Sequence, residues 1–311
     1  MEQRWRSSST PAPAKPSAGN RQPRCSTQLL HSPVEITSQE DESNPERPVA
    51  FLIALGEVRD MAERRVAAIF DLDGTLVQTE ALKARSYARA AVELSPDTVR
   101  AQEIIVAYDD MVGHSRERVA AALLSRFALE AHAAQRMTAL GVSTPLDAYM
   151  ALRLEIYEAM IADERLIREQ EYPWSTSLLR EVRRDGYPVG IATMSHRKHA
   201  VRVLERLGLT NEVDVLCTRE DVREAKPSPE IFFLIAVRMD VEPSDCFVLE
   251  DSLPGVRAAN AAGMCCVAIT NDMTRDAIHA ALVLPVERVV DDPALLGSVV
   301  RAALAELARS R

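Results

Sequence analysis

The sequence predicts an α/β fold, namely a doubly wound parallel sheet with an inserted all-α helical cap domain. From residue 66 onward, short apolar runs alternate with amphipathic helical stretches, which is the pattern of parallel strands joined by right-handed helical crossovers. One stretch, from about residue 81 to 168, has only helical spacing and is too long for a simple crossover. We therefore expect a helical insertion that stands over one edge of the sheet.

The first strand is predicted from the apolar run 66–70, which ends abruptly at Asp71. Such a run is typical of a strand that is buried on both faces of a sheet. Four later runs have the same character, at 188–193, 213–217, 246–250 and 265–269. Helices are expected between them at about 197–207, 229–239 and 254–262, and Gly208 and Gly263 are placed to end two of these helices.

Residues 1–64 differ in character from the rest of the chain, and we expect a disordered N-terminal extension there. Up to about residue 48 they are rich in Ser, Pro, Gln and Arg, and too poor in apolar side chains to offset the entropy of ordering. An apolar run at 48–56 is too short to span a bilayer. The predicted domains are then a core formed by 65–80 and 171–311 and a helical cap formed by 81–170.

The composition of the chain limits its partners. The 311 residues carry a formal net charge of −9, which argues against nucleic acid or an anionic membrane as a partner and favours a small molecule. The five cysteines form no CxxC pair and have no metal-ligand spacing, so a reducing, cytoplasmic compartment is expected. Import into an organelle through the Arg- and Ser-rich N-terminus remains open. We expect a monomer or a weak homo-oligomer.

Polar groups follow four of the predicted strands. Asp71 and Asp73 follow the first, Thr193 ends the second, Lys226 lies in the loop after the third, and Glu250-Asp251 ends the fourth. Because the carboxyl ends of parallel strands meet at one edge of a sheet, these groups should share one site. An acid nucleophile, a second acid, a hydroxyl group and a lysine suit phosphoryl transfer. Several carboxylates in one place need a cation, and an all-oxygen site suits Mg²⁺.

In these motifs the chain resembles the haloacid dehalogenase superfamily, and within it the β-phosphoglucomutase-like group with a helical cap. The resemblance covers about residues 65–295 and implies a Rossmann-like core. Four segments match the motifs of the family in order: Asp71-Leu72-Asp73-Gly74-Thr75, then Thr193, then Lys226-Pro227-Ser228-Pro229-Glu230, then Glu250-Asp251-Ser252-Leu253-Pro254-Gly255. Each motif is weak alone, but four in order, each at a strand end, are specific.

The resemblance implies a role for each of these residues. Asp71 would be the nucleophile and Asp73 the general acid and base. Thr193 and Lys226 would bind the oxygens of the transferred phosphate. Mg²⁺ would be held by the Asp71 carboxylate, the Asp73 backbone carbonyl and Asp251, with Glu250 in support.

Substrate selection is expected to come from the cap. The segment Gly113-His114-Ser115-Arg116 resembles the cap motif whose arginine grips a non-reacting phosphate of the substrate, and Arg153 lies where this group often has a basic residue. Lys83, Arg116 and Arg153 would then form a basic rim that accepts a second anionic group. The alternative is three basic residues on solvated helix faces. Ser195 either contacts the substrate or caps the helix that follows it.

The function expected from these residues is that of a Mg²⁺-dependent phosphatase. It would hydrolyse a small phosphorylated molecule, such as a sugar phosphate, through an aspartyl-phosphate intermediate. The alternative is an intramolecular sugar phosphomutase, although the chain departs from the mutase-like group at Gln78 and Lys83, where an acid and a histidine are common. A non-catalytic binding module is a third reading, but we expect such a protein to have lost one of the catalytic groups.

Overall fold

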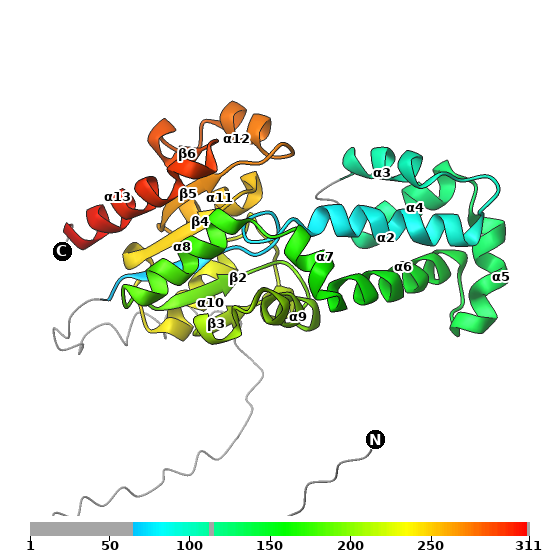
Figure 1. Ribbon diagram of the computed structural model, residues 1–311, viewed down its shortest axis with the longest axis horizontal. Coiled ribbons are helices and arrows are strands. Elements are labelled where there is room, and N and C mark those ends of the chain that lie inside the picture. Colours follow the sequence, from blue (N-terminus) through cyan, green and yellow to red (C-terminus); the bar gives the residue numbers. More distant parts are fainter. Residues whose placement is uncertain (1–64, 112–114, 310–311) are drawn as a thin grey trace, which may run out of the picture. The chain divides into compact units, whose positions relative to one another are not determined.

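The computed structural model describes residues 65–111 and 115–309, and it confirms the predicted fold class (Figure 1). Within this part of the chain, parallel strands form one sheet in the order β3-β2-β1-β4-β5-β6. Their bounds are β1 Ala67–Phe70, β2 Val189–Ala192, β3 Val215–Cys217, β4 Cys246–Glu250, β5 Cys265–Ile269 and β6 Val289–Val290. Strand β6 is a short addition to the five predicted strands. The predicted disordered extension, residues 1–64, lies outside the described residues.

The order of the strands creates one special position in the sheet. The chain moves from β1 outward through β2 to β3, and then crosses to β4 on the other side of β1. The direction of winding therefore reverses between β1 and β4, which is the switch point where sheets of this type bind ligands. The register pairs Phe70 with Ile191 on β2 and with Leu249 on β4. The residues that follow on these three strands consequently leave the sheet at the same edge.

Alternate side chains of β1 enter two apolar clusters, one on each face of the sheet. Ala68 and Phe70 belong to the cluster that α8, α9 and α13 cover, whereas Ala67 and Ile69 belong to the cluster that α10, α11 and α12 cover. Burial on both faces explains the continuous apolar run. The core helices are α8 Pro173–Arg184, α9 Arg197–Leu207, α10 Glu230–Met239, α11 Leu253–Ala261, α12 Arg275–Ala281 and α13 Leu296–Arg309. Short 3₁₀ turns lie at Thr210–Glu212, Arg219–Asp221, Pro243–Asp245, Val286–Arg288 and Pro293–Leu295.

Residues 79–169, here called the helical insertion, are helical as predicted wherever they form regular structure in the described chain. The helices are α2 Thr79–Leu94, α3 Ala101–Asp109, α4 Arg116–Arg126, α5 Glu130–Leu140, α6 Pro145–Ala162 and α7 Glu164–Glu169. Apolar side chains of the insertion, among them Tyr87, Leu123 and Tyr149, form a cluster of their own. On this ground we propose that the insertion is a separate domain, with the predicted division at 81–170. No helix in the described residues is long and apolar enough to cross a membrane.

The two chain segments that join the insertion to the core run side by side. Val77 and Glu171 form an antiparallel bridge, and the Gln78 amide donates a hydrogen bond to the Gln170 carbonyl oxygen at 2.8 Å. Helix α2 therefore begins close to the switch-point edge of the sheet. This position brings the first turn of α2 against Asp73, to which the Thr79 hydroxyl group donates a hydrogen bond.

We expect Gly190→Ala to destabilise the fold. Gly190 lies within β2, and a Cβ atom there would lie 2.6 Å from Ile235 Cδ1 and 2.8 Å from Met239 Sδ. Overpacking of this kind costs about 1–3 kcal/mol, which a lower denaturant midpoint of unfolding would report. Gly297→Ala is the matched control, since its Cβ would meet only the flexible end of Arg301. Equal stability of Gly190→Ala and the wild type would contradict this account of the packing.

Candidate active site

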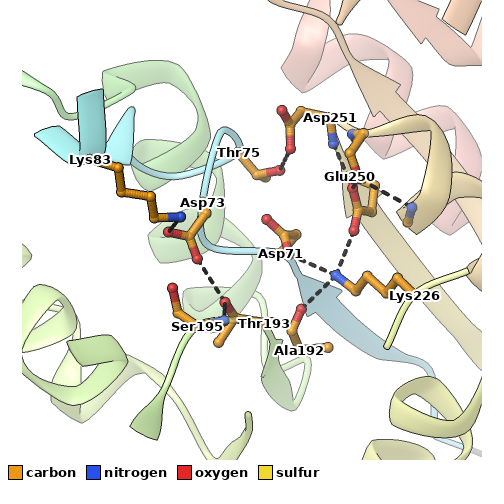
Figure 2. A network of polar contacts seen from close by, with 12 residues as sticks. Asp71, Asp73, Thr75, Lys83, Ala192, Thr193, Ser195, Lys226, Glu250 and Asp251 are labelled. Carbon is orange, nitrogen blue, oxygen red and sulfur yellow. Dashed lines mark hydrogen bonds and ion pairs between the residues drawn. The ribbon is translucent and has the colours of Figure 1, made fainter. Parts of the chain in front are cut away.

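Side chains from three strand ends and one loop meet at the switch-point edge of the sheet (Figure 2). Asp71 follows β1, Thr193 follows β2, and Glu250 is the last residue of β4, with Asp251 after it. Lys226 comes from the loop between β3 and α10, and it contacts Asp71 across 155 residues of sequence. The residues of the four motifs are therefore neighbours in space.

Lys226 is the centre of the charged contacts. Its Nζ atom donates hydrogen bonds to Asp71 Oδ1 at 2.7 Å, to Glu250 Oε1 at 2.6 Å and to the Ala192 carbonyl oxygen at 2.9 Å. The side chain is buried, and the ammonium group lies 5.1 Å from the centre of the Phe232 ring. Burial by itself would lower the pKa of Lys226, but the Asp71 and Glu250 carboxylates outweigh it and raise this pKa above its usual value. The lysine therefore stays charged.

Glu250 joins Lys226 to the start of α11. Its Oε2 atom accepts hydrogen bonds from the Asp251 and Ser252 amides and from the Ser252 hydroxyl group, each at 3.0 Å. A Cβ atom on Gly255 would lie only 1.8 Å from Glu250 Oε1, so the fourth motif needs a glycine there. The Glu250 side chain is fully buried. Both of its carboxylate oxygens therefore accept hydrogen bonds from other groups of the protein.

Asp251 is held by residues other than Lys226. The Thr75 hydroxyl group donates to Asp251 Oδ1 at 3.2 Å, and the Asn271 side-chain amide donates to Asp251 Oδ2 at 3.0 Å. Gly74 has a positive φ of +92°, and a Cβ atom on it would lie 2.2 Å from Asp251 Oδ2. Glycine is needed at this position both for the backbone conformation and for the close approach of the carboxylate.

The acidic residues fit a magnesium site. Asp71, Glu250 and Asp251 are buried, and each offers a carboxylate oxygen within 4.8 Å of the others. Burial raises the pKa of Asp71 to about 8, with Glu250 and Asp73 adding to the effect and Lys226 opposing it. Burial also raises the pKa of Asp251 well above its usual value, and the Glu250 and Asp71 carboxylates add to this effect. A hard divalent cation would favour the ionised carboxylates, and these all-oxygen donors suit Mg²⁺.

Asp73 has different surroundings from Asp71. Its Oδ2 atom accepts a hydrogen bond from the Thr193 hydroxyl group at 2.8 Å, and its Oδ1 atom accepts from Lys83 Nζ at 3.2 Å and from Thr79. Burial by itself would raise the pKa of Asp73, but the Lys83 charge and the hydrogen bonds from Thr79, Ser195 and Thr193 lower it to about 2. The pKa values of the two acids of the first motif are thus shifted in opposite directions.

Ser195 lies beside Asp73 and Thr193 (Figure 2). Its backbone amide donates to Thr193 Oγ1 at 3.0 Å, and its side chain helps to lower the pKa of Asp73. The residue that precedes α9 is His196, and no side chain caps that helix. The local geometry therefore favours the interpretation of Ser195 as a residue of the site over its interpretation as a helix cap.

The three predicted basic residues of the insertion have different surroundings. Lys83 contacts Asp73 and pairs with Glu80 Oε1 at 2.6 Å. Arg153 is only 3% exposed, so it does not lie on a solvated helix face. Its guanidinium carbon lies 4.5 Å and 4.8 Å from the ring centres of Tyr87 and Tyr157, respectively, and its Nε atom has no hydrogen-bond partner in the described chain.

Arg116 is the first residue of α4, and it contacts helix α2 through its backbone. Its carbonyl oxygen accepts a hydrogen bond from the Tyr87 hydroxyl group at 3.3 Å. Tyr87 therefore lies between Arg116 and Arg153, whereas Lys83 is the basic residue of the insertion that contacts the first motif directly. Gly113 and His114, the start of the predicted cap motif, lie outside the described residues.

Sequence reasoning missed Asn271, Glu80 and Tyr108. Asn271 is a polar residue shortly after β5, so its position at a fifth strand end was an available signal. Glu80 lies between two partners, because Lys83 donates to Glu80 Oε1 and the Tyr108 hydroxyl group donates to Glu80 Oε2, each at 2.6 Å. This pairing joins α2 to α3. The local sequence carries no signal for it, because Tyr108 lies 28 residues away from Glu80.

Comparison with known protein families identifies the class of this chain. The sequence profile of the haloacid dehalogenase-like hydrolases matches residues 66–263, a span that contains all four motifs. The chain therefore belongs to this family. The predicted enzyme class, a hydrolase of the haloacid dehalogenase superfamily, is confirmed.

Individual proteins show what the chain resembles. It is 30% identical over 222 residues to the validoxylamine A 7'-phosphate phosphatase of Streptomyces hygroscopicus subsp. limoneus, covering 70% of this chain and 91% of that protein. It is 28% identical over 215 residues to the fructose-1-phosphate phosphatase YqaB of Escherichia coli (strain K12), covering 66% and 96%. The solved structure of β-phosphoglucomutase from Clostridium difficile aligns with a TM-score of 0.56 at 23% identity, covering 78% and 98%, which shows a shared fold.

Mg²⁺ should stabilise the protein more at about pH 8.5 than at about pH 6. The pKa of Asp71 is raised from its ordinary value of 3.8 to about 8. At a pH between these two pKa values, the metal-free folded protein holds a proton that the unfolded chain releases. The unfolding free energy contributed by this group therefore falls as the pH rises toward 8. Mg²⁺ binding to the ionised carboxylate would restore what is lost.

Thermal unfolding with and without Mg²⁺ at both pH values measures this effect. Asp71→Asn is the control, because a neutral amide removes one of the two titrating carboxyl groups and should weaken the pH dependence of the Mg²⁺-induced shift in Tm, with Asp251 contributing what remains. A shift in the wild type that is the same at both pH values would contradict the prediction.

Proposed function

We propose that this protein is a Mg²⁺-dependent phosphatase that hydrolyses a small phosphoester, such as a sugar phosphate, through an aspartyl-phosphate intermediate. The observation that carries the proposal is the position of Asp71, whose Oδ1 atom is bound by Lys226 while Glu250 and Asp251 approach from the next strand. Asp73 lies beside this group as a second acid. The two phosphatases that the chain resembles are named for phosphate esters of small molecules, which supports the substrate class.

In the first step, an oxygen of Asp71 attacks the phosphorus atom and forms the phosphoenzyme bond, while the bond from phosphorus to the leaving oxygen breaks. Asp73 donates a proton to that oxygen, so an alcohol leaves. Lys226 contributes a fixed positive charge next to Asp71 Oδ1, where it would attract the phosphate oxygens. Mg²⁺ held by Asp71, the Asp73 backbone carbonyl and Asp251 would reduce the repulsion between the carboxylates and the phosphate.

In the second step, Asp73 removes a proton from a water molecule, and the water oxygen attacks the phosphorus atom of the aspartyl phosphate. Phosphate leaves, and the Asp71 carboxylate is restored. Asp73 must be protonated in the first step and ionised in this one, and the proton that it takes from water restores the protonated form for the next turnover. Lys83 and the neighbouring hydroxyl groups lower the pKa of Asp73, which favours the ionised form that the second step needs. Thr193 contributes by fixing the Asp73 carboxylate through its hydrogen bond at 2.8 Å.

Substrate binding is assigned in this proposal to Lys83, Arg116, Arg153 and Ser195. Lys83 and Ser195 lie beside Asp73, where the leaving group would bind. Arg153 is buried without an acidic partner in the described chain, and a buried guanidinium group is costly unless an anion pairs with it. We therefore expect the substrate to carry a second anionic group, which would bind near Arg153 and Arg116.

The first experiment measures phosphate release from a panel of sugar phosphates and polyol phosphates, with and without Mg²⁺. The wild type should release phosphate only with the metal, and Asp71→Asn should reduce turnover at least about a thousandfold because it removes the nucleophile. Asp73→Ala should slow both steps. Thermal unfolding of each variant verifies that it is folded.

Two outcomes would contradict the proposed function. Substantial turnover by folded Asp71→Asn would exclude the covalent mechanism. Absence of phosphate release, together with interconversion of a hexose 1-phosphate after addition of a bisphosphate, would indicate the phosphomutase instead.

Arg153→Gln should weaken the binding of substrates that carry a second anionic group. For substrates with a second anionic group we expect KM to rise about tenfold to a hundredfold with a smaller change in kcat, because a charge-assisted hydrogen bond contributes about 1.5–3 kcal/mol. Monoanionic analogues of the same size serve as the control and should show little change. An equal loss on both kinds of substrate would show that Arg153 acts only through the packing of Tyr87 and Tyr157.

A further inference from the structure

Asn271 lies shortly after the end of β5. Strand β5 is the neighbour of β4, which ends at Glu250 and is followed by Asp251. The side-chain Nδ2 atom of Asn271 donates a hydrogen bond to Asp251 Oδ2 at 3.0 Å. None of the four family motifs contains this residue. It brings a fifth strand end to the site.

The orientation of the Asn271 amide is determined by the backbone around it. Its Oδ1 atom accepts a hydrogen bond from the Met273 amide at 2.9 Å, so the Nδ2 atom must be the one that faces Asp251. The backbone of Asn271 is held as well. Its amide donates to Thr274 Oγ1 at 3.2 Å, and its carbonyl oxygen accepts from the Thr274 and Arg275 amides at 3.1 and 3.0 Å. The side chain therefore projects toward Asp251 from a fixed turn.

Among the described residues, each side-chain oxygen of Asp251 has one donor. Thr75 donates to Oδ1 and Asn271 donates to Oδ2, and the backbone of Gly74 lies against Oδ2. These contacts come from the loops that follow β1 and β5, the neighbours of β4 on either side. Together they restrict rotation of the Asp251 carboxylate. Without Asn271, Oδ2 would lose its one hydrogen-bond donor in the described chain.

We propose that Asn271 is a positioning residue for the metal site, which holds the Asp251 carboxylate in the orientation that binds a divalent cation together with Asp71. The inference rests on the magnesium site of the proposed function. A residue of this kind acts on metal affinity through the ligand that it orients. Removing it typically weakens metal binding by about tenfold to a hundredfold. Substrate binding, which involves other residues, should be affected much less.

The test is calorimetric titration of Mg²⁺ into the metal-free full-length protein without substrate. We expect Asn271→Ala to raise the dissociation constant for Mg²⁺ about tenfold or more. Asn271→Ser is a second variant, because its hydroxyl group still offers an acceptor to the Met273 amide and preserves the turn, but is too short to reach Asp251. It should lose the same affinity. In steady-state assays at saturating Mg²⁺, KM for the substrate should stay close to that of the wild type.

The matched control is Thr274→Ala, which removes another hydrogen bond of the same turn and leaves the contact with Asp251 in place. It should bind Mg²⁺ as the wild type does. Unchanged Mg²⁺ affinity in folded Asn271→Ala or Asn271→Ser would overturn the inference and leave the proposed function standing. An equal loss in Thr274→Ala would also overturn it, since the turn alone would then be responsible. A wild type that binds no Mg²⁺ would overturn both proposals.

Discussion

The site depends on a single buried ammonium group. The Lys226 side chain is 5% exposed, and its ammonium group divides its hydrogen bonds among Asp71, Glu250 and a backbone carbonyl group of β2. Burying a carboxylate without such a partner costs roughly several kcal/mol of folding free energy. The lysine therefore allows these two acids to lie close to each other. One lysine cannot balance the further acid, Asp251, which also lies in the cluster. The remaining negative charge makes this edge of the sheet suited to a cation, and then to a phosphate group bound against it.

The topology of the sheet brings these charges together. Because β1 and β4 are neighbours at the switch point, the acids that follow them leave the sheet at one edge although they are far apart in the chain. Two glycines then allow the close contacts. Gly74 lets Asp251 lie against the loop after β1, and Gly255 lets Glu250 turn toward Lys226. A side chain at either position would push a carboxylate out of the cluster, so the glycines are as much a part of the site as the acids.

The helical insertion supplies groups of a different kind. Lys83 contacts Asp73 from helix α2. Glu80 binds both Lys83 and Tyr108, and so connects this lysine to helix α3. Arg153 lies between aromatic rings, which partly compensate its charge through cation–π contacts. The core thus concentrates acids around a lysine, whereas the insertion concentrates basic and aromatic side chains. In the proposed function, the first set performs the chemistry and the second recognises the rest of the substrate.

The sequence by itself determined the fold class, the helical insertion and the four motifs, because apolar runs and the acids that end them are local patterns. It also indicated Asp71, Asp73, Lys226 and Asp251, since their order along the strands is enough to place them at one edge. The tertiary structure decided which groups touch. The opposite pKa shifts of Asp71 and Asp73, the burial of Arg153 and the contact of Asn271 with Asp251 all depend on residues from distant segments. Such contacts leave no local pattern, because packing sets them only after the strands have paired.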